Sequence, residues 1–232
     1  MKTIGLIGGM SWESSLEYYR LINEEVKNRL GGFHSAKCIL YSVDFAEIEE
    51  MQMAGRWAEQ AQIMVSAGQS LQRAGADFLV LCTNTMHKLA DELQAGVQVP
   101  LLHIADATAR QVQAAGIHTI GLLGTRFTME QDFYRGRLEE KFGLKVLTPP
   151  APEREIVHNV IYNELCLGLV KPESRRAYAR IIADLLQAGA QGVILGCTEI
   201  ELLVRPEDSP APLFPTTRIH ALAAVDFALA SS

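Results

Sequence analysis

The sequence predicts an α/β fold made of two pseudo-symmetric parallel-sheet α/β domains, with a ligand site in the cleft between them. Short apolar runs alternate with amphipathic helical stretches, a pattern typical of parallel sheets. Two pairs of segments repeat about half a chain apart. In each half an apolar run ends in a short polar turn, and ligands bind at the carboxyl ends of such strands.

The first half reads as strand, helix, strand, helix, strand. The apolar run at 4–7 stops at glycines, lacks a signal-peptide cleavage pattern and is expected to be the first strand. A helix is expected at 14–30 because its apolar residues recur at helical spacing. A strand follows at 39–43 and a helix at 56–73. The latter runs through Ala-Gly-Ala into a buried strand at 78–81.

The second half also alternates apolar runs with helical stretches. Strands are expected at 117–123 and 193–195. The helices are expected at 129–142, 174–188 and, after the second polar turn, 198–204. A last helix at 219–229 follows the proline-rich stretch 206–215, and we expect it to cross back and pack on the first half.

Two ungapped matches indicate a duplication. Residues 74–85 align with 188–199, which are 114 residues later, and 4–8 align with 120–124, which are 116 residues later. Two matches in the same order at nearly one spacing are poorly explained by chance. The predicted domains are 1–115 plus 217–232, and 116–216.

Composition excludes several classes of protein. The chain has 232 residues, 48% hydrophobic and 21% charged, which is ordinary for a soluble globular protein. The net charge of −6 and the lack of a basic run argue against a nucleic-acid partner. No apolar stretch approaches the ~18 residues of a membrane helix, so no membrane partner is expected.

The four cysteines are few and far apart, which fits neither a disulfide framework nor a Cys-x-x-Cys metal site. We therefore expect a reducing, cytoplasmic setting. Cys38 and Cys166 are expected in the core. Cys197 differs because it lies between a strand and a helix, where the helix dipole would lower the thiol pKa from about 8.5 toward neutrality. The alternative for Cys197 is a buried, inert thiol.

The matching turn of the first half is Thr83-Asn84-Thr85. Its short polar side chains, with the N–H groups of the next helix, suit a carboxylate. The alternative is ordinary helix capping by Asn84 or Thr85. Cys82 aligns with Gly196 rather than Cys197, and alternation along a strand points it away from a ligand, unless the turn slips by one residue.

Other motifs are weaker. Gly8 and Gly9 do not complete a dinucleotide fingerprint, and we expect them to let the backbone approach a small ligand, with Met10 at its edge. No phosphate-binding loop or metal motif is present, so neither a cofactor nor a metal is expected. His87 lies one helical turn after Thr83 and is expected to line the site. Possible cations for an acidic substrate, or else solvated surface charges, are Arg56, Arg126 and Lys171.

The turns Cys82-Thr83-Asn84-Thr85-Met86-His87 and Gly196-Cys197-Thr198-Glu199 resemble signatures of the aspartate/glutamate racemase family, and 4–10, 100–106 and 161–164 look like its aspartate racemase branch. The resemblance implies two α/β domains, an active site between them and a homodimer. It also implies a small-molecule amino-acid substrate and racemisation without pyridoxal phosphate or metal. A thiolate would remove the Cα proton, and a thiol on the opposite face would return one.

The sequence departs from this family at Thr83, where the family has its first cysteine. A neutral hydroxyl donates a proton far more easily than it abstracts one, so we expect unequal chemistry. The resemblance implies that Cys197 acts on the L-enantiomer. Carried over by position, the α-carboxylate ligands are Asn84, Thr85 and Thr198, the pocket is lined by Met10 and Gln52, and the side-chain carboxylate meets Lys171. Pro215 also replaces an aspartate that is usual in these relatives.

Two alternatives stay open. The first is a one-thiol lyase of the wider superfamily, such as an arylmalonate-type decarboxylase, because Thr83 fits a turn without cysteine. The second is a dicarboxylate-binding protein in which Thr83 marks weakened catalysis.

Overall fold

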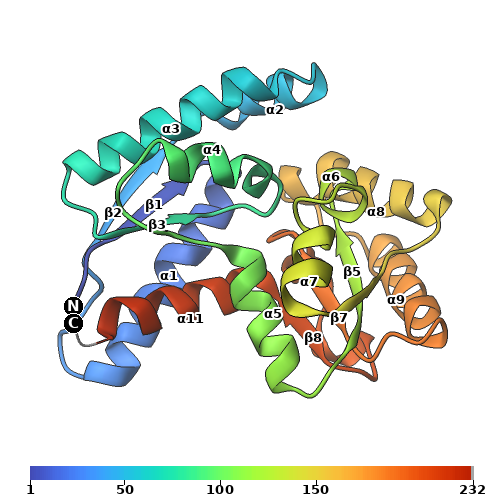
Figure 1. Cartoon of the computed structure of the whole chain (residues 1–232). Coiled ribbons are helices and arrows are strands. Elements are labelled where there is room, and N and C mark those ends of the chain that lie inside the picture. The colour runs from blue at the N-terminus through green and yellow to red at the C-terminus, as the bar shows by residue number, and fades with distance from the viewer. Residues whose placement is uncertain (231–232) are drawn as a thin grey trace. The chain divides into compact units, whose positions relative to one another are not determined.

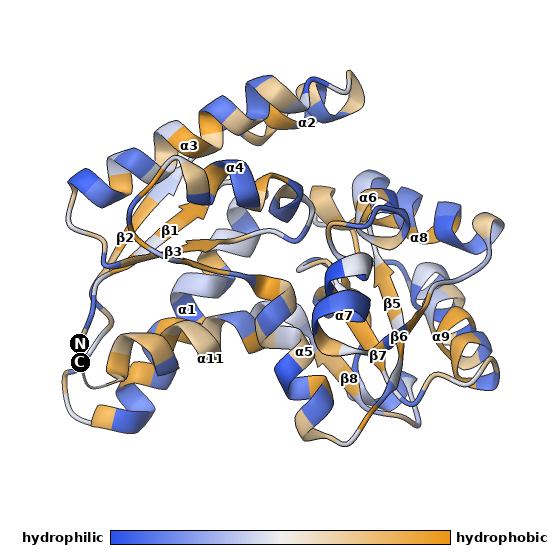
Figure 2. Ribbon diagram, viewed as in Figure 1, coloured by the Kyte–Doolittle hydropathy of each residue, from blue (hydrophilic) through white to orange (hydrophobic). Residues whose placement is uncertain are grey.

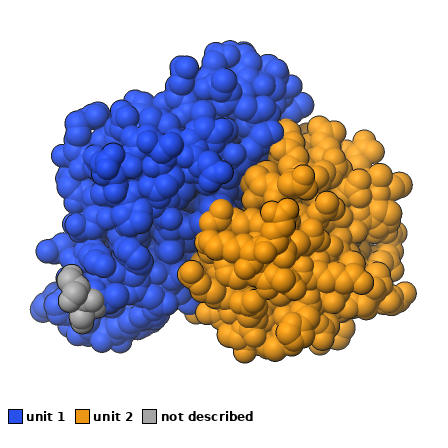
Figure 3. Space-filling view, in the orientation of Figure 1, with its two compact units in different colours: residues 1–104, 220–232 blue, residues 105–219 orange. Residues whose placement is uncertain are grey.

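The computed structural model describes residues 1–230. The chain divides into two compact units, residues 1–104 with those from 220 onward, and residues 105–219 (Figure 3). Relative to the expected domains, 1–115 plus 217–232 and 116–216, the helix that starts at Ile104 belongs with the second sheet. None of the helices within residues 1–230 is long and apolar enough to cross a membrane.

Each unit contains one four-stranded parallel sheet. The first has the order β2-β1-β3-β4 and the second β6-β5-β7-β8, so the two orders correspond strand for strand. The strands of the first sheet are β1 (Ile4–Gly8), β2 (Cys38–Ser42), β3 (Phe78–Leu81) and β4 (Leu101–Leu102). Those of the second are β5 (Thr119–Gly124), β6 (Lys145–Leu147), β7 (Val193–Gly196) and β8 (Leu213–Pro215). The predicted pair of parallel α/β domains is confirmed.

Helices cover both faces of the first sheet (Figure 1). They are α1 (Trp12–Leu30), α2 (Phe45–Met53), α3 (Trp57–Arg73), η1 (Thr85–Leu89), α4 (Ala90–Ala95) and α11 (Thr216–Leu229). Phe78 and Val80 pack with α1 and α11, whereas Leu79 and Leu81 pack with α3 and α4. Alternate residues of one strand thus fill two cores, and the apolar strands stand out in Figure 2. The prediction that the last helix packs on the first half is confirmed.

The second sheet has its own helices, namely α5 (Ile104–Ala114), α6 (Arg126–Glu130), α7 (Arg135–Phe142), α8 (Ala151–Asn163), η2 (Leu165–Leu167), α9 (Pro172–Gln187), α10 (Ile200–Leu203) and η3 (Pro206–Asp208). Val157 of α8 and Ile181 of α9 share a core with Leu195 of β7. Asp106 of α5 accepts hydrogen bonds from Arg137 and Lys141 of α7, which ties those two helices together.

Two expected helices differ from the structure. The segment 129–142 is not one helix, because Gln131 adopts an extended backbone and ends α6 before α7 begins. Tyr134, in the interruption, is fully buried. The helix expected at 198–204 is only the single turn α10.

Packing within the first unit accounts for Gly8 and Gly9, at the end of β1 and just after it. A Cβ on Gly8 would clash with Ser15 Oγ, and one on Gly9 would clash with the Val43 carbonyl oxygen. Gly9 also has a φ of +91°. Its N–H donates to Ser15 Oγ at 2.7 Å, which fixes the start of α1 against the end of β1.

We predict that Gly9→Ala destabilises the chain more than Gly31→Ala does. Both glycines have positive φ, at +91° and +75°, but nothing lies within 4 Å of a Cβ on Gly31. Backbone strain is therefore common to both variants, and the clash with Val43 adds about 1–3 kcal/mol to the loss in Gly9→Ala. Urea unfolding followed by circular dichroism measures the difference. Equal losses in the two variants would show that the Val43 contact relaxes without cost.

Candidate active site

The first polar turn leaves the carboxyl end of β3. The Cys82 N–H donates to the Ile7 carbonyl at 2.9 Å, so pairing with β1 continues one residue past the strand. The Thr83 N–H then donates back to the Leu81 carbonyl at 2.9 Å, and the chain turns into η1. Thr83, Asn84 and Thr85 are all buried, and the Asn84 side chain does not cap η1.

Cys82 lies in the core. It continues the alternation of Phe78 and Val80, and its side chain packs in the same cluster as Tyr18. Its thiol donates to the Val80 carbonyl at 3.8 Å, and burial raises the pKa of the thiol far above its usual range. The expectation from strand alternation, that Cys82 points away from a ligand at the turn, agrees with this placement.

Met10 and Gln52 both lie beside the first turn. Met10 packs in the same core cluster as Met86 of η1. Gln52, on α2 and almost fully buried, donates from Nε2 to the Met86 sulfur at 3.1 Å. The first unit therefore gathers five of the expected site residues at one edge of its sheet, namely Met10, Gln52, Thr83, Asn84 and Thr85.

His87 is buried beneath the turn. Its Nδ1 lies 2.7 Å from the Thr83 carbonyl oxygen, and its Nε2 accepts from the Ile104 N–H at 3.2 Å. Sequence reasoning expected His87 to line the site. In the structure both ring nitrogens are instead engaged with the protein backbone, which makes the ring part of the support of the turn.

The second polar turn leaves β7 and carries Cys197, whose side chain is partly buried. Its Sγ donates to Glu199 Oε2 at 2.9 Å. Burial, followed by the charge of Glu199, raises the pKa of the Cys197 thiol well above its usual value. The expected fall of this pKa toward neutrality is therefore not supported. The helix that follows is one turn long, and a carboxylate beside the sulfur outweighs its dipole.

Lys171 lies before α9 in the same unit. Its Nζ is 3.2 Å from Glu164 Oε1, and Ser174 Oγ donates to Glu164 Oε2 at 2.6 Å. Charges on Glu164 and Cys197 both raise the pKa of the buried Tyr178 phenol, after burial itself. Tyr178 and Cys197 pack in one core cluster of the second unit.

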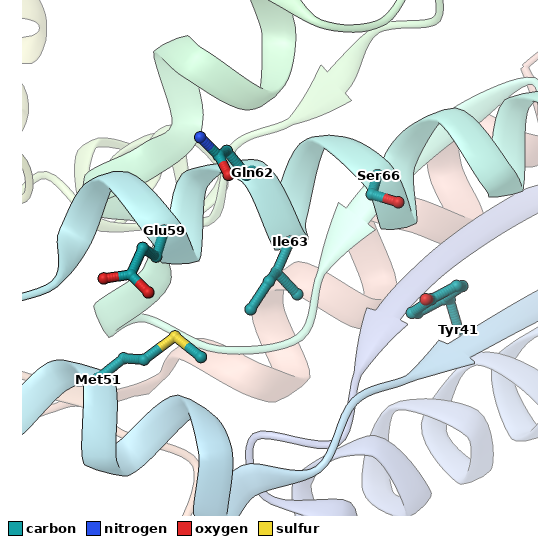
Figure 4. A pocket seen from close by; sticks show the side chains of 6 residues that line it. All are labelled: Tyr41, Met51, Glu59, Gln62, Ile63 and Ser66. Carbon is teal, nitrogen blue, oxygen red and sulfur yellow. The ribbon is translucent and has the colours of Figure 1, made fainter.

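The remaining expected cation on the first unit is a surface residue. Arg56 pairs with Glu50 at 2.9 Å and with Glu59 at 3.4 Å. A cavity of about 410 Å³ lies between β2, α2 and α3, and it contains none of the candidate site residues (Figure 4). Its lining is Tyr41, Met51, Glu59, Gln62, Ile63 and Ser66. Within residues 1–230, no group of three or more His, Cys, Asp or Glu residues is placed to hold a metal ion.

Sequence reasoning missed several groups. Glu199 is the most important of them. The sequence did indicate it, because it is the last residue of the second motif, two residues after Cys197. Tyr18, His103 and His220 come from three distant segments, and nothing in the sequence indicated that they meet.

The chain thus consists of two α/β units, each with a parallel sheet in which a central strand ends in a polar turn. The chain belongs to the Asp/Glu/Hydantoin racemase family, whose model matches residues 7–224. It is therefore an isomerase of a racemase family.

Individual relatives agree with this assignment. A crystal structure of a candidate Asp/Glu racemase from Yersinia pestis is similar, with 59% identity and a TM-score of 0.93, over 99% of this chain and 100% of that one. An aspartate racemase homologue from Pyrococcus horikoshii has 35% identity and a TM-score of 0.85, over 98% and 99% of the two chains. The broad specificity amino-acid racemase RacX of Bacillus subtilis is 23% identical over 179 residues, 74% of each chain.

The fold is also shared by an enzyme with different chemistry. Arylmalonate decarboxylase aligns over 99% of this chain and 94% of its own, with 14% identity and a TM-score of 0.54. At this identity the likeness concerns the fold alone.

We predict that His220 makes stability fall between pH 6.5 and 4. Burial lowers its pKa to about 4 in the folded chain, from 6.5 when unfolded. Below pH 6.5 the His220 ring binds a proton in the unfolded chain but stays neutral in the folded chain, so acid favours unfolding. When the pH falls from 7 to 5, the free energy of unfolding of the wild type should decrease by about 2 kcal/mol relative to that of His220→Gln.

Urea unfolding at the two pH values measures this difference. His34→Gln, at an exposed histidine, is the matched control and should not reproduce it. If the difference in free energy of unfolding between wild type and His220→Gln were the same at both pH values, His220 would bind a proton as readily in the folded chain as in the unfolded one.

Proposed function

We propose that the chain racemises aspartate or glutamate, with Cys197 removing the Cα proton and Thr83 acting on the opposite face. Family membership supports racemase activity in general. The observation that carries the finer proposal is the Cys197 thiol hydrogen-bonded at 2.9 Å to the buried Glu199 carboxylate, at the carboxyl end of a central strand. Thr83 occupies the corresponding turn of the other sheet.

Inversion at one carbon needs two proton-transfer groups, one on each face. A duplicated chain offers two equivalent turns, and our proposal places the substrate between them, in a cleft between the two domains. We further propose that the protein is a homodimer with one such cleft in each subunit, and that it is cytoplasmic. The reaction uses neither pyridoxal phosphate nor a metal. The N–H groups and hydroxyls of both turns would stabilise the negative charge that develops beside the carboxylate.

Glu199 activates the thiol in this mechanism. The Cys197 S–H bond breaks, the proton passes to Glu199 Oε2, and the thiolate then takes the Cα proton of the L-enantiomer. A raised pKa makes the thiolate a stronger base once it forms, although it is rarely populated at rest. Glu199 is therefore a proton acceptor in direct contact with the reacting sulfur.

Thr83 completes the inversion. Its hydroxyl donates a proton to the carbanion from the opposite face and recovers one from water. Protonated Glu199 releases its proton to the resulting hydroxide, so the enzyme returns to its starting state. The reverse direction requires Thr83 to abstract a proton, for which a neutral hydroxyl is a poor base. Because racemisation has an equilibrium constant of one, kcat/KM is equal in the two directions. The proposed bias toward the L-enantiomer is therefore a higher kcat that is matched by a higher KM.

The remaining residues bind the substrate. Asn84, Thr85 and Thr198 would hold the α-carboxylate, and Met10 and Gln52 would line the pocket. Lys171 would meet the side-chain carboxylate, which must compete with the Glu164 carboxylate that already faces it at 3.2 Å. A dicarboxylic amino acid supplies both anionic groups.

We predict that Cys197→Ser abolishes exchange of the Cα proton of L-aspartate and L-glutamate in heavy water, with a loss of about 10²–10⁴-fold. Thr83→Cys should increase turnover of the D-enantiomer, because a thiol is the stronger base. Deuterium incorporation measured by NMR, followed by chiral chromatography, provides both values. Normal exchange in Cys197→Ser would refute the proposed mechanism.

A one-thiol decarboxylase is the second candidate, since only one of the two turns carries a cysteine at the matching position. Carbon dioxide release from an arylmalonate, with no exchange on aspartate, would establish it. Thermal stabilisation by aspartate or glutamate without any exchange would instead indicate a binding protein.

We predict that Glu199→Gln lowers kcat about 10²-fold and that Glu199→Asp recovers part of it. The glutamine variant should also lower the pKa of Cys197, since the neighbouring negative charge is gone. Alkylation by iodoacetamide against pH, corrected with Cys197→Ser, measures that shift. Glu155→Gln, which removes an exposed charge of the same unit, is the control. A shifted alkylation profile with unchanged kcat would remove Glu199 from the mechanism.

A further inference from the structure

The His87 ring can hold only one protonation state in its surroundings. The Thr83 carbonyl oxygen, 2.7 Å from Nδ1, can only accept, so Nδ1 carries the hydrogen. The Ile104 backbone N–H, 3.2 Å from Nε2, can only donate, so Nε2 is bare. A proton on Nε2 would turn that hydrogen bond into a clash between two donors. His87 is therefore neutral and in a single tautomer.

This ring fixes the peptide group that follows Thr83. The Thr83 N–H donates to the Leu81 carbonyl at 2.9 Å, and the Thr83 carbonyl accepts from His87. Both backbone polar groups of Thr83 are thus held. Since the direction of a Cβ follows from its backbone, these two hydrogen bonds fix the Thr83 Cβ and so confine the hydroxyl to the few positions that the staggered rotamers allow.

The chain segment that carries the Ile104 N–H, on the Nε2 side of the His87 ring, is itself held in place. His220 Nε2 donates to the Leu102 carbonyl at 2.8 Å, and its Nδ1 accepts from the Tyr18 hydroxyl at 2.8 Å. The His103 ring packs on His87 with centroids 4.5 Å apart. All these rings are buried. The segment that presents the Ile104 N–H is therefore fixed from two directions.

We propose that His87 is a positioning residue for the Thr83 hydroxyl, through its hydrogen bonds to the Thr83 carbonyl and the Ile104 N–H. The inference rests on the proposed function, in which Thr83 delivers a proton to the carbanion. His87 does not touch the substrate in this account. It determines how often an abstracted proton leads to inversion rather than to return on the same face.

Two substitutions separate its two hydrogen bonds. His87→Asn places an amide nitrogen near the position of Nδ1 and keeps a donor for Thr83. His87→Gln places its amide near Nε2, keeps an acceptor for Ile104 and loses the bond to Thr83. Both remove the ring, so loss of burial and packing is common to the pair.

The measurement is the ratio of inversion to Cα deuterium exchange with retention, starting from L-aspartate or L-glutamate in heavy water. Exchange with retention needs Cys197 alone, whereas inversion also needs Thr83. We expect the ratio to fall about 10-fold or more in His87→Gln and to recover in His87→Asn. Thr83→Ala, which lacks the hydroxyl, gives the lower limit of this ratio. Equal ratios in His87→Gln and the wild type overturn the inference.

A measurement on the wild type covers the case in which neither variant folds. Nitrogen-15 NMR of the histidine rings should show His87 neutral with its hydrogen on Nδ1 at pH 7. A charged ring, or a hydrogen on Nε2, overturns the inference. Lack of any exchange in the wild type would instead refute the proposed function, so the two failures are distinguishable.

Discussion

The pairing of β3 with β1, and of β7 with β5, decides where the polar residues of the candidate site lie. In the first sheet Leu81 pairs with Ile7, and in the second Gly196 pairs with Gly124. β7 ends level with β5, and β3 ends one residue short of the end of β1, so the chain turns at nearly the same level in both sheets. Because the strands are parallel, both turns fall at the carboxyl edge of their sheets.

At rest, neither of the two proposed proton-transfer residues, Cys197 and Thr83, is deprotonated. Burial and a neighbouring carboxylate keep the Cys197 thiol protonated, and Thr83 offers a neutral hydroxyl. The histidines beneath the first turn are neutral as well, since backbone groups hold His87 in one tautomer and burial lowers the pKa of His220 to about 4. Negative charge is therefore concentrated on Glu199, which contacts the sulfur. The duplicated fold thus holds two chemically different halves, one built around a thiol and a carboxylate, the other around a hydroxyl and neutral imidazoles.

The sequence predicted β1, β2, β3, β5 and β7 and the helices α1, α3 and α9 because their signals are local: apolar runs bounded by glycine, and helical periodicity in segments such as 14–30. It did not predict the short strands β4, β6 and β8 or the helices α5 and α8. It also predicted the two turns, because they repeat. It did not predict the direction of the Cys197 pKa shift, because the short helix and the orientation of the Glu199 carboxylate are not local properties. The contact between His220 and Leu102 joins segments more than a hundred residues apart, and no periodicity reports it.

The matching order of the two sheets has an evolutionary consequence. In an assembly of identical half-length chains, any substitution in the turn would appear in every copy at once. A fused gene removes that restriction, because position 83 and position 197 are encoded separately. One copy can keep its cysteine while the other acquires a threonine, and a directional preference becomes heritable.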